Sequence, residues 1–188
     1  MFYHNINPIL FSLGPFQIRY YGIIYVLGFV IAYFLINYII KKKGLDITKD
    51  DVTDLLFYLL IGVILGSRLF YVLVYNPKYF LAHPLDIFAI WHGGLSFHGG
   101  FIGSIVATLI FCKKKKVSFL ELGDIIVIPL SIALALGRIG NFLNGELYGR
   151  VTNLPWAVKF KGAEGFRHPS QIYESLKNLF IFSVLWTL

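Results

Sequence analysis

Five long apolar segments constrain this chain more than any other feature of its sequence. They cover residues 20–40, 52–75, 95–112, 119–136 and 171–188, and each contains few charges. A helix needs about 20 apolar residues to cross the roughly 30 Å hydrocarbon core of a bilayer. With 57% hydrophobic and 14% charged residues, the composition is not that of a soluble domain. We therefore predict an all-α integral membrane protein, a polytopic helical bundle of about five transmembrane helices that forms a single transmembrane domain over residues 1–188.

The formal net charge of +7 is concentrated in two short loops. Eight of the seventeen basic residues lie there: Lys41–Lys43, Lys49 and Lys113–Lys116. Lysine-rich loops stay on the cytoplasmic side of a membrane, which places the N-terminus and the loops at residues 76–94 and 137–170 on the outer side. Such lysines also attract anionic lipid. This distribution argues against nucleic acid as a partner and indicates membrane lipid instead.

The most distinctive polar stretch, Gly137–Arg150, directly follows the fourth apolar segment. Arg138, Asn141 and Asn144 recur every three residues and drift around one helical face. Four glycines disfavour a regular helix through the whole stretch, and irregular backbone at membrane depth is tolerated where it is buried or lines a cavity. One interpretation is a pocket for an anionic group. The other is a helix end that leaves the bilayer with an interfacial arginine, and the pattern alone supports both about equally.

Three more polar residues are predicted to lie at the same boundary, each with two interpretations. His98 either exchanges a proton or packs at a helix interface. Arg68 either snorkels to the interface or has a protein or ligand partner, and Tyr21 fits an aromatic belt or a hydrogen bond to a ligand. The complete boundary set also contains Arg138, Asn141, Asn144, Glu146, His168, Gln171 and Glu174. Transporters and channels distribute polar groups through the membrane, so a set confined to one interface favours an enzyme or receptor for lipid head groups.

Glycines and a proline predict local packing and a helix boundary. The pair Gly62 and Gly66, and the later Gly99 and Gly103, are spaced for close helix packing. Pro169 followed by Ser170 predicts a helix that starts at Ser170, with the serine as its N-cap.

The two histidines of residues 92–98 lack zinc-site spacing, so no metal site is expected.

The stretch Gly137–Arg150 resembles the signature of the prolipoprotein diacylglyceryl transferase family. The supporting matches are Arg19–Gly22, Gly66–Arg68, Ser96–Gly100 and Arg167–Glu174, which follow the family's order and together extend over most of the chain. The resemblance implies a bacterial cytoplasmic-membrane enzyme whose active site faces outward and which uses no cofactor. Its implied substrates are phosphatidylglycerol and a preprolipoprotein signal peptide with a lipobox cysteine.

The resemblance also implies roles for individual residues. The diacylglyceryl group would move to the cysteine thiol, forming a thioether and releasing glycerol 1-phosphate. The catalytic residues would be His98, Tyr21 and Arg138, with the identity of the base open. Phosphatidylglycerol would be bound by Arg138, Asn141, Arg68, Asn144 and Glu146. The alternative from another class is a non-catalytic lipid-binding membrane protein or a small transporter.

The last apolar segment ends at Leu188 without a flanking charge. Members of the resembled family continue through further spans, with another arginine implicated in activity. We therefore expect the sequence to be C-terminally truncated.

Overall fold

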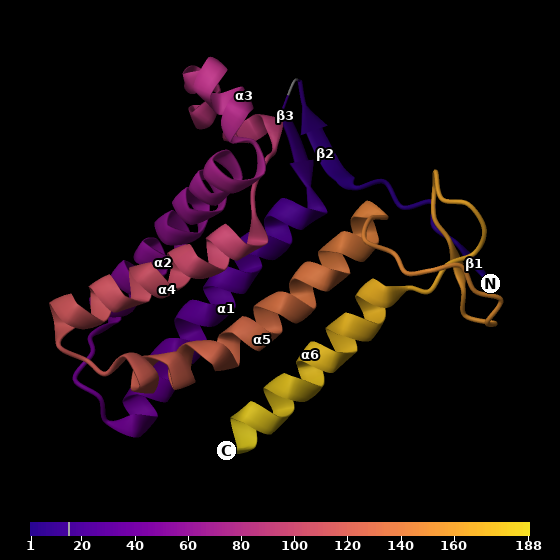
Figure 1. Cartoon of the computed structure of the whole chain (residues 1–188). Helices are drawn as coiled ribbons and strands as arrows, with labels where there is room; N and C mark the ends of the chain where they lie inside the picture. The colour runs from indigo at the N-terminus through magenta and orange to yellow at the C-terminus, as the bar shows by residue number, and fades with distance from the viewer. Residues whose placement is uncertain (15) are drawn as a thin grey trace. The chain divides into compact units, whose positions relative to one another are not determined.

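The computed structural model describes residues 1–14 and 16–188, and helices dominate it (Figure 1). The long helices are α1 (Tyr20–Lys43), α2 (Lys49–Phe70), α4 (Phe97–Lys115), α5 (Phe119–Asn144) and α6 (Ser170–Thr187). Among the described residues, three segments are long and apolar enough to cross a membrane: α1, α5, and α2 with its π-helical extension η1 (Tyr71–Tyr75). The prediction of an all-α membrane protein is confirmed. That α4 and α6 also span the membrane remains a prediction.

The chain divides into two compact units. One contains Met1–Ile39 and Ile125–Leu188, and the other contains Ile40–Asp124. The unit boundaries fall inside α1 and α5, so each of these helices contributes to both units. A single domain over the whole chain remains a prediction.

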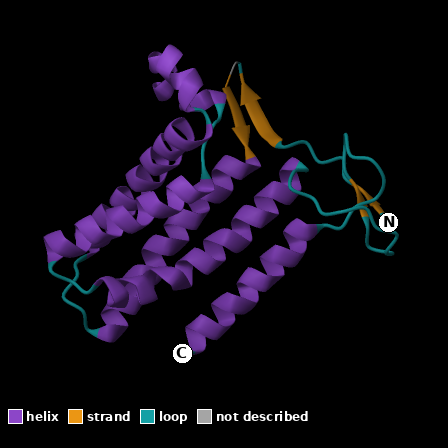
Figure 2. Ribbon diagram, in the orientation of Figure 1, coloured by secondary structure: helices purple, strands orange, loops and turns teal. Residues whose placement is uncertain are grey.

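In the unit Ile40–Asp124, α2 and α4 lie against each other along a glycine seam, and Figure 2 shows them as neighbouring helices. A β-carbon at Gly62 would lie 2.6 Å from the carbonyl oxygen of Gly103. A β-carbon at Gly66 would likewise overlap the backbone of Gly99. Side chains at these positions would push the helices apart, so the predicted close packing is confirmed.

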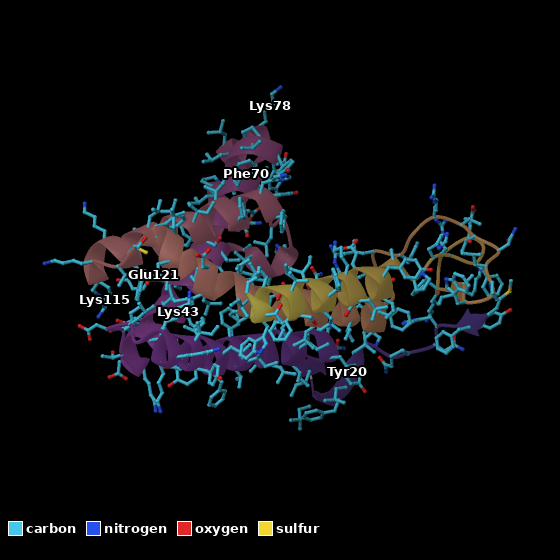
Figure 3. The ribbon with its side chains drawn as sticks, turned by 90° about the horizontal axis from the view of Figure 1, so that it is seen from below. Tyr20, Lys43, Phe70, Lys78, Lys115 and Glu121 are labelled. Atoms are coloured by element: carbon cyan, nitrogen blue, oxygen red, sulfur yellow. The ribbon has the colours of Figure 1, made fainter. Side chains whose placement is uncertain are left out.

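Lysines lie at both ends of this unit, and those in the last turns of α1 and α4 lie at the same end. Figure 3 shows Lys43 and Lys115 at one end, and Phe70 and Lys78 at the other. The Lys115 ammonium forms an ion pair with the Asp51 carboxylate near the start of α2. Basic residues in the last turn of a helix interact favourably with its C-terminal partial negative charge, so these lysines also stabilise the helix end that carries them.

Three short helices connect α2 to α4: α3 (Pro77–Ala82), η2 (Pro84–Phe88) and η3 (Ile90–His92). Several of their large apolar side chains are exposed, among them Leu81, Leu85, Phe88 and Trp91. The segment therefore contributes little apolar core of its own, and its backbone conformation has to be stabilised by other contacts.

In the other unit, α1 packs against α5. A β-carbon at Gly28 would lie 3.5 Å from the Ala133 β-carbon, and one at Gly140 would lie 2.8 Å from the ring of Tyr21. Near the far end of α1, the Tyr38 and Trp186 rings stack with centroids 5.7 Å apart. The contact between Tyr21 and Gly140 places the first turn of α1 beside the last turns of α5.

The structure also contains short strands that the sequence analysis did not predict (Figure 2). Strands β2 (Ile9–Leu13) and β3 (Phe16–Arg19) form an antiparallel hairpin, and β1 (Phe2–Tyr3) pairs in parallel with β4 (Val158–Lys159). Segments of two to five residues are too short to show a clear alternating pattern, and the β1–β4 pairing joins residues far apart in sequence.

The segment predicted as a loop at residues 137–170 is more ordered than the sequence indicates. Residues 137–144 are the last two turns of α5. Beyond them, Val158, Phe160 and Ala163 form a small buried core that Phe142 and Tyr148 cover. Apolar residues of this segment thus bury one another, and the chain that follows α5 is folded back onto the end of that helix.

Candidate functional site

The end of α5 has a specific backbone geometry. The helix stops at Asn144, and Gly145 follows with a φ of +70°. The Gly145 amide donates to the Phe142 carbonyl at 2.9 Å, and the Glu146 amide donates to the Asn141 carbonyl at 3.1 Å. This pair of bonds is the Schellman motif, which suits a glycine because only glycine adopts a left-handed conformation at little cost. The turn reverses the chain so that Glu146 lies back over the last helical turn.

Three predicted site residues meet at this turn. The Glu146 carboxylate accepts hydrogen bonds from the side-chain amides of Asn141, at 2.9 Å, and Asn144, at 3.2 Å. Asn141 is buried, whereas Glu146 is exposed. Hydrogen bonds to a charged acceptor are stronger than neutral ones, so one carboxylate fixes the orientation of both amides. Asn141 and Asn144, two of the three residues in the i, i+3 spacing noted in the sequence, therefore share one acceptor.

Arg138 lies two turns earlier on α5 and pairs with α6. Its Nη2 atom is 2.9 Å from the Glu174 carboxylate. The Arg138 side chain is 34% exposed and the Glu174 side chain 39% exposed, so the ion pair is open to solvent on one side. A guanidinium has five N–H donors, and one carboxylate oxygen engages only part of that set. Glu174 therefore orients Arg138 while leaving it able to bind a second anionic group.

The first turn of α6 holds the chain that follows α5. Helix α6 starts at Ser170, as the sequence predicts, but Pro169 occupies the N-cap position and makes no side-chain capping bond. The Ser170 hydroxyl instead donates to the Leu147 carbonyl at 2.9 Å. The buried Gln171 side-chain amide donates to the Glu146 carbonyl at 2.6 Å. The predicted capping role of Ser170 is thus wrong, because a tertiary acceptor lies within reach of its hydroxyl.

Tyr21, in the first turn of α1, lies beside the end of α5 in the unit formed by Met1–Ile39 and Ile125–Leu188. Its ring packs against Gly140, where a β-carbon would collide with it. The hydroxyl donates a long hydrogen bond of 3.4 Å to the Tyr25 hydroxyl. Its contact with Gly140 places Tyr21 beside the last turns of α5, which carry Asn141, and its part in the site remains a prediction.

His98 belongs to the other unit, in the first turn of α4. Ser96 caps this helix, because its hydroxyl oxygen accepts from the Gly99 amide at 3.3 Å. The imidazole is exposed and lies near the Phe70 ring, with centroids 6.4 Å apart. Neither ring nitrogen takes part in a protein hydrogen bond among the described residues. An exposed imidazole on a rigid helix start can exchange a proton with a substrate.

Arg68, in the same unit as His98, is surrounded by backbone carbonyls. Its side chain is only 6% exposed. Nε donates to Ile87 at 2.9 Å, Nη1 to Gly93 and Gly94 at 2.7 and 3.0 Å, and Nη2 to Asp86 and Ala89 at 2.5 and 3.4 Å. The guanidinium also lies 5.1 Å above the Phe80 ring.

These contacts decide between the two interpretations of Arg68. A snorkelling side chain reaches water, whereas this one holds the connection between α2 and α4. All five N–H donors have a protein acceptor. The alternative with a protein partner is the one observed, and the sequence could not identify it because the acceptors are main-chain atoms.

Residues 8–188 match the protein family described as prolipoprotein diacylglyceryl transferase. The match extends over nearly the whole chain. The chain belongs to this family.

Relatives of this transferase are similar over most of their length. A phosphatidylglycerol–prolipoprotein diacylglyceryl transferase of Geobacter sulfurreducens is 50% identical over 177 residues, which cover 94% of this chain and 68% of the relative. Enzymes of the same name from Legionella pneumophila strain Lens and Rickettsia canadensis are 46% and 47% identical, over 98% of this chain and 73% and 72% of their own lengths. The resemblance drawn from the signature stretch is confirmed, and the protein is a membrane transferase.

The geometry divides the predicted site residues of the transferase into two groups. Tyr21, Arg138, Asn141, Asn144 and Glu146 lie at one end of the unit that contains α5 and α6, whereas Arg68 and His98 belong to the other unit. The first group combines a cation, two amides and a carboxylate at the end of an apolar helix. Such a set can bind a phosphate ester and neighbouring hydroxyl groups.

Sequence reasoning missed two partners of this group. Glu174 was placed at the same boundary but not paired with Arg138, and Gln171 was not connected to Glu146. The available signal was the spacing of Gln171 and Glu174, three residues apart, which puts both on one side of the first turn of α6.

Proposed function

We propose that this chain transfers the sn-1,2-diacylglyceryl group of phosphatidylglycerol to the lipobox cysteine thiol of a preprolipoprotein, the first step of lipoprotein maturation. The sulfur forms a bond to the glycerol carbon that carries the phosphate ester. The bond from that carbon to the ester oxygen breaks, glycerol 1-phosphate leaves, and the thiol proton passes to a base. The observation that carries the proposal is the group of Arg138, Asn141 and Glu146 at the end of an apolar helix, in a chain of this family.

Arg138 is proposed to stabilise the leaving phosphate. Negative charge grows on the phosphate as the carbon–oxygen bond breaks, and donors that are already oriented stabilise that charge most. The ion pair with Glu174, at 2.9 Å, supplies this orientation. Arginine suits the role because its planar group donates two parallel hydrogen bonds to one phosphate.

Asn141, Asn144 and Glu146 are proposed to bind the glycerol head group. The carboxylate holds both amides in place and, being exposed, is able to accept a hydrogen bond from a glycerol hydroxyl. Arg68 is proposed to support head-group binding indirectly. Its five donors are directed at main-chain carbonyls, so its contribution would come from the shape of the loop that precedes α4.

His98 and Tyr21 are proposed to activate or position the thiol. The thiolate is the nucleophile, so a nearby base raises the reactive fraction. A neutral imidazole accepts a proton directly, whereas a tyrosine hydroxyl positions the sulfur through a hydrogen bond. Which of the two acts as the base is left to the kinetic test below.

The site is proposed to face the outer side of a bacterial cytoplasmic membrane. The lysine-rich ends of α1 and α4 support this orientation, since basic residues stay on the cytoplasmic side. The candidate residues on α5 lie in its last two turns, beyond its most apolar part. An outward site would meet lipoprotein precursors as they emerge from translocation.

The direct test is a transfer assay with the full-length protein. The purified protein is mixed with phosphatidylglycerol and a lipobox peptide, and the mass of the peptide is measured. We expect a mass increase equal to one diacylglyceryl group, together with release of glycerol 1-phosphate. A peptide whose mass does not change, with lipid nevertheless bound, would support the non-catalytic alternative.

The same assay examines His98. His98→Asn should lower kcat while leaving phosphatidylglycerol binding intact, because the imidazole is proposed to act on the thiol. His92→Asn is the matched control, since His92 is an exposed histidine of the preceding loop. Unchanged turnover of His98→Asn across a pH series would assign thiol activation to Tyr21 or to substrate ionisation.

A further inference from the structure

The backbone at Leu147 adopts a conformation that leucine rarely takes. Its φ is +56°, in the left-handed region, and it directly follows Glu146. A non-glycine residue in this region is strained because its β-carbon approaches the following carbonyl oxygen. The side chain is 63% exposed, so its own packing does not compensate. Other contacts must hold the backbone in this state.

Two side chains from the first turn of α6 supply those contacts. The Ser170 hydroxyl donates to the Leu147 carbonyl at 2.9 Å, and the Gln171 side-chain amide donates to the Glu146 carbonyl at 2.6 Å. These two carbonyl groups lie immediately before and after the α-carbon of Leu147. We call Ser170 and Gln171, with these two hydrogen bonds, the α6 clamp.

Main-chain bonds continue the attachment beyond the α6 clamp. The Gly149 amide donates to the His168 carbonyl at 2.9 Å, and the His168 amide donates to the Arg150 carbonyl at 3.1 Å. Gly149 is required there, since a β-carbon would lie 2.9 Å from the His168 β-carbon. The chain after Glu146 therefore runs along the segment that leads into α6 with little freedom to move.

Gln171 would be a costly residue if it served packing alone. Its side chain is 1% exposed, and the side-chain oxygen is buried with no partner among the described residues. Burying an unsatisfied acceptor is unfavourable, and an apolar side chain of similar size would avoid that cost. The favourable term that the structure shows is the hydrogen bond to Glu146.

We propose that Ser170 and Gln171 are positioning residues for the transfer reaction. They hold the backbone of Glu146 and Leu147, and thereby keep the Glu146 carboxylate on the amides of Asn141 and Asn144. This inference rests on the proposed function, in which those three side chains bind the lipid head group. The same helical turn carries Glu174, so it orients Arg138 and Glu146 together.

The experiment uses Ser170→Ala and Gln171→Glu in the full-length protein. The first removes the hydroxyl donor. The second keeps nearly the same shape but places an acceptor against the Glu146 carbonyl. Loss of the neutral hydrogen bond in Ser170→Ala should lower kcat/KM roughly 2- to 10-fold. In Gln171→Glu, the repulsion between the new carboxylate and the Glu146 carbonyl oxygen should lower it by about tenfold or more. Ser183→Ala is the matched control, because that hydroxyl donates to the Leu179 carbonyl within α6, and it should leave transfer unchanged.

A double-mutant cycle separates positioning from general stabilisation. If the α6 clamp acts through Glu146, adding Gln171→Glu to Glu146→Gln should cause little further loss, since residues acting as a unit are not additive. Adding Leu147→Gly to Ser170→Ala should restore part of the lost activity, because glycine adopts a positive φ without strain. Fully additive losses, or no rescue by glycine, would overturn the proposal.

A structural measurement keeps the test independent of activity. Amide hydrogen exchange should become faster in residues 145–150 of Ser170→Ala and Gln171→Glu, and unchanged within residues 125–135. Unchanged exchange in residues 145–150 would also overturn the α6 clamp. If the unmodified protein transferred no diacylglyceryl group, the proposed function would fail, while the exchange data would still decide whether the clamp exists.

Discussion

Replacing Arg138 by lysine tests the proposed phosphate site most sharply. Lysine keeps the positive charge and has enough length to stay near Glu174, so insertion and folding should be preserved. It loses the planar fork of donors, which a point charge cannot reproduce. If Arg138 were only an interfacial cation, lysine would serve nearly as well.

The size of the effect follows from the geometry. In the structure, Nη2 of Arg138 is 2.9 Å from Glu174, and the side chain is 34% exposed. A hydrogen bond to a charged group contributes about 1.5–3 kcal/mol, and solvent screening at a partly exposed position favours the lower end. Lysine satisfies either Glu174 or the phosphate well, but not both. With one such bond lost, and 1.4 kcal/mol per factor of ten, we expect transfer to fall roughly 10- to 100-fold.

The assay measures the rate of diacylglyceryl transfer to a lipobox peptide and, separately, the affinity for phosphatidylglycerol. Both should decrease in Arg138→Lys, whereas the melting temperature should not. Arg19→Lys is the matched control, because that exposed guanidinium donates to the side chain of Gln17. Activity of Arg138→Lys within twofold of the unmodified enzyme would mean that only charge is required, and the phosphate site would have to lie elsewhere.

Three further changes test the fold and its orientation. Gly103→Ala places a β-carbon against the backbone of α2 and should cost about 1–3 kcal/mol of stability in thermal melting, whereas Gly123→Ala, in open space, should cost nothing. Arg68→Lys should lower the melting temperature and speed hydrogen exchange of Asp86–Gly94, because lysine cannot bind five carbonyls; unaltered exchange would contradict its structural role. A cysteine at Lys113 should resist membrane-impermeant reagents in intact cells, and labelling from outside would reverse the proposed topology.

The helices were predictable because their information is local. A helix satisfies its backbone hydrogen bonds within its own segment, so apolar runs of about 20 residues identify α1, α2 and α5 without reference to the rest of the chain. The close packing at the glycine pairs of α2 and of α4 was predictable for the same reason, since small residues four apart lie on one helical face, but only the structure shows that the two helices pack on each other. The start of α6 at Ser170 followed from Pro169, which cannot continue a helix in its interior.

The partners of the polar side chains were decided by tertiary structure alone. The guanidinium of Arg68 binds carbonyls of residues 86–94, and every residue type has a carbonyl, so no pattern in the sequence marks them. The Ser170 hydroxyl left its expected capping role because Leu147 came within reach. The pairs of Arg138 with Glu174 and of Gln171 with Glu146 depend on how the chain returns after α5. A hydrogen bond needs its two atoms about 3 Å apart, and for residues distant in sequence only the packed chain determines that separation.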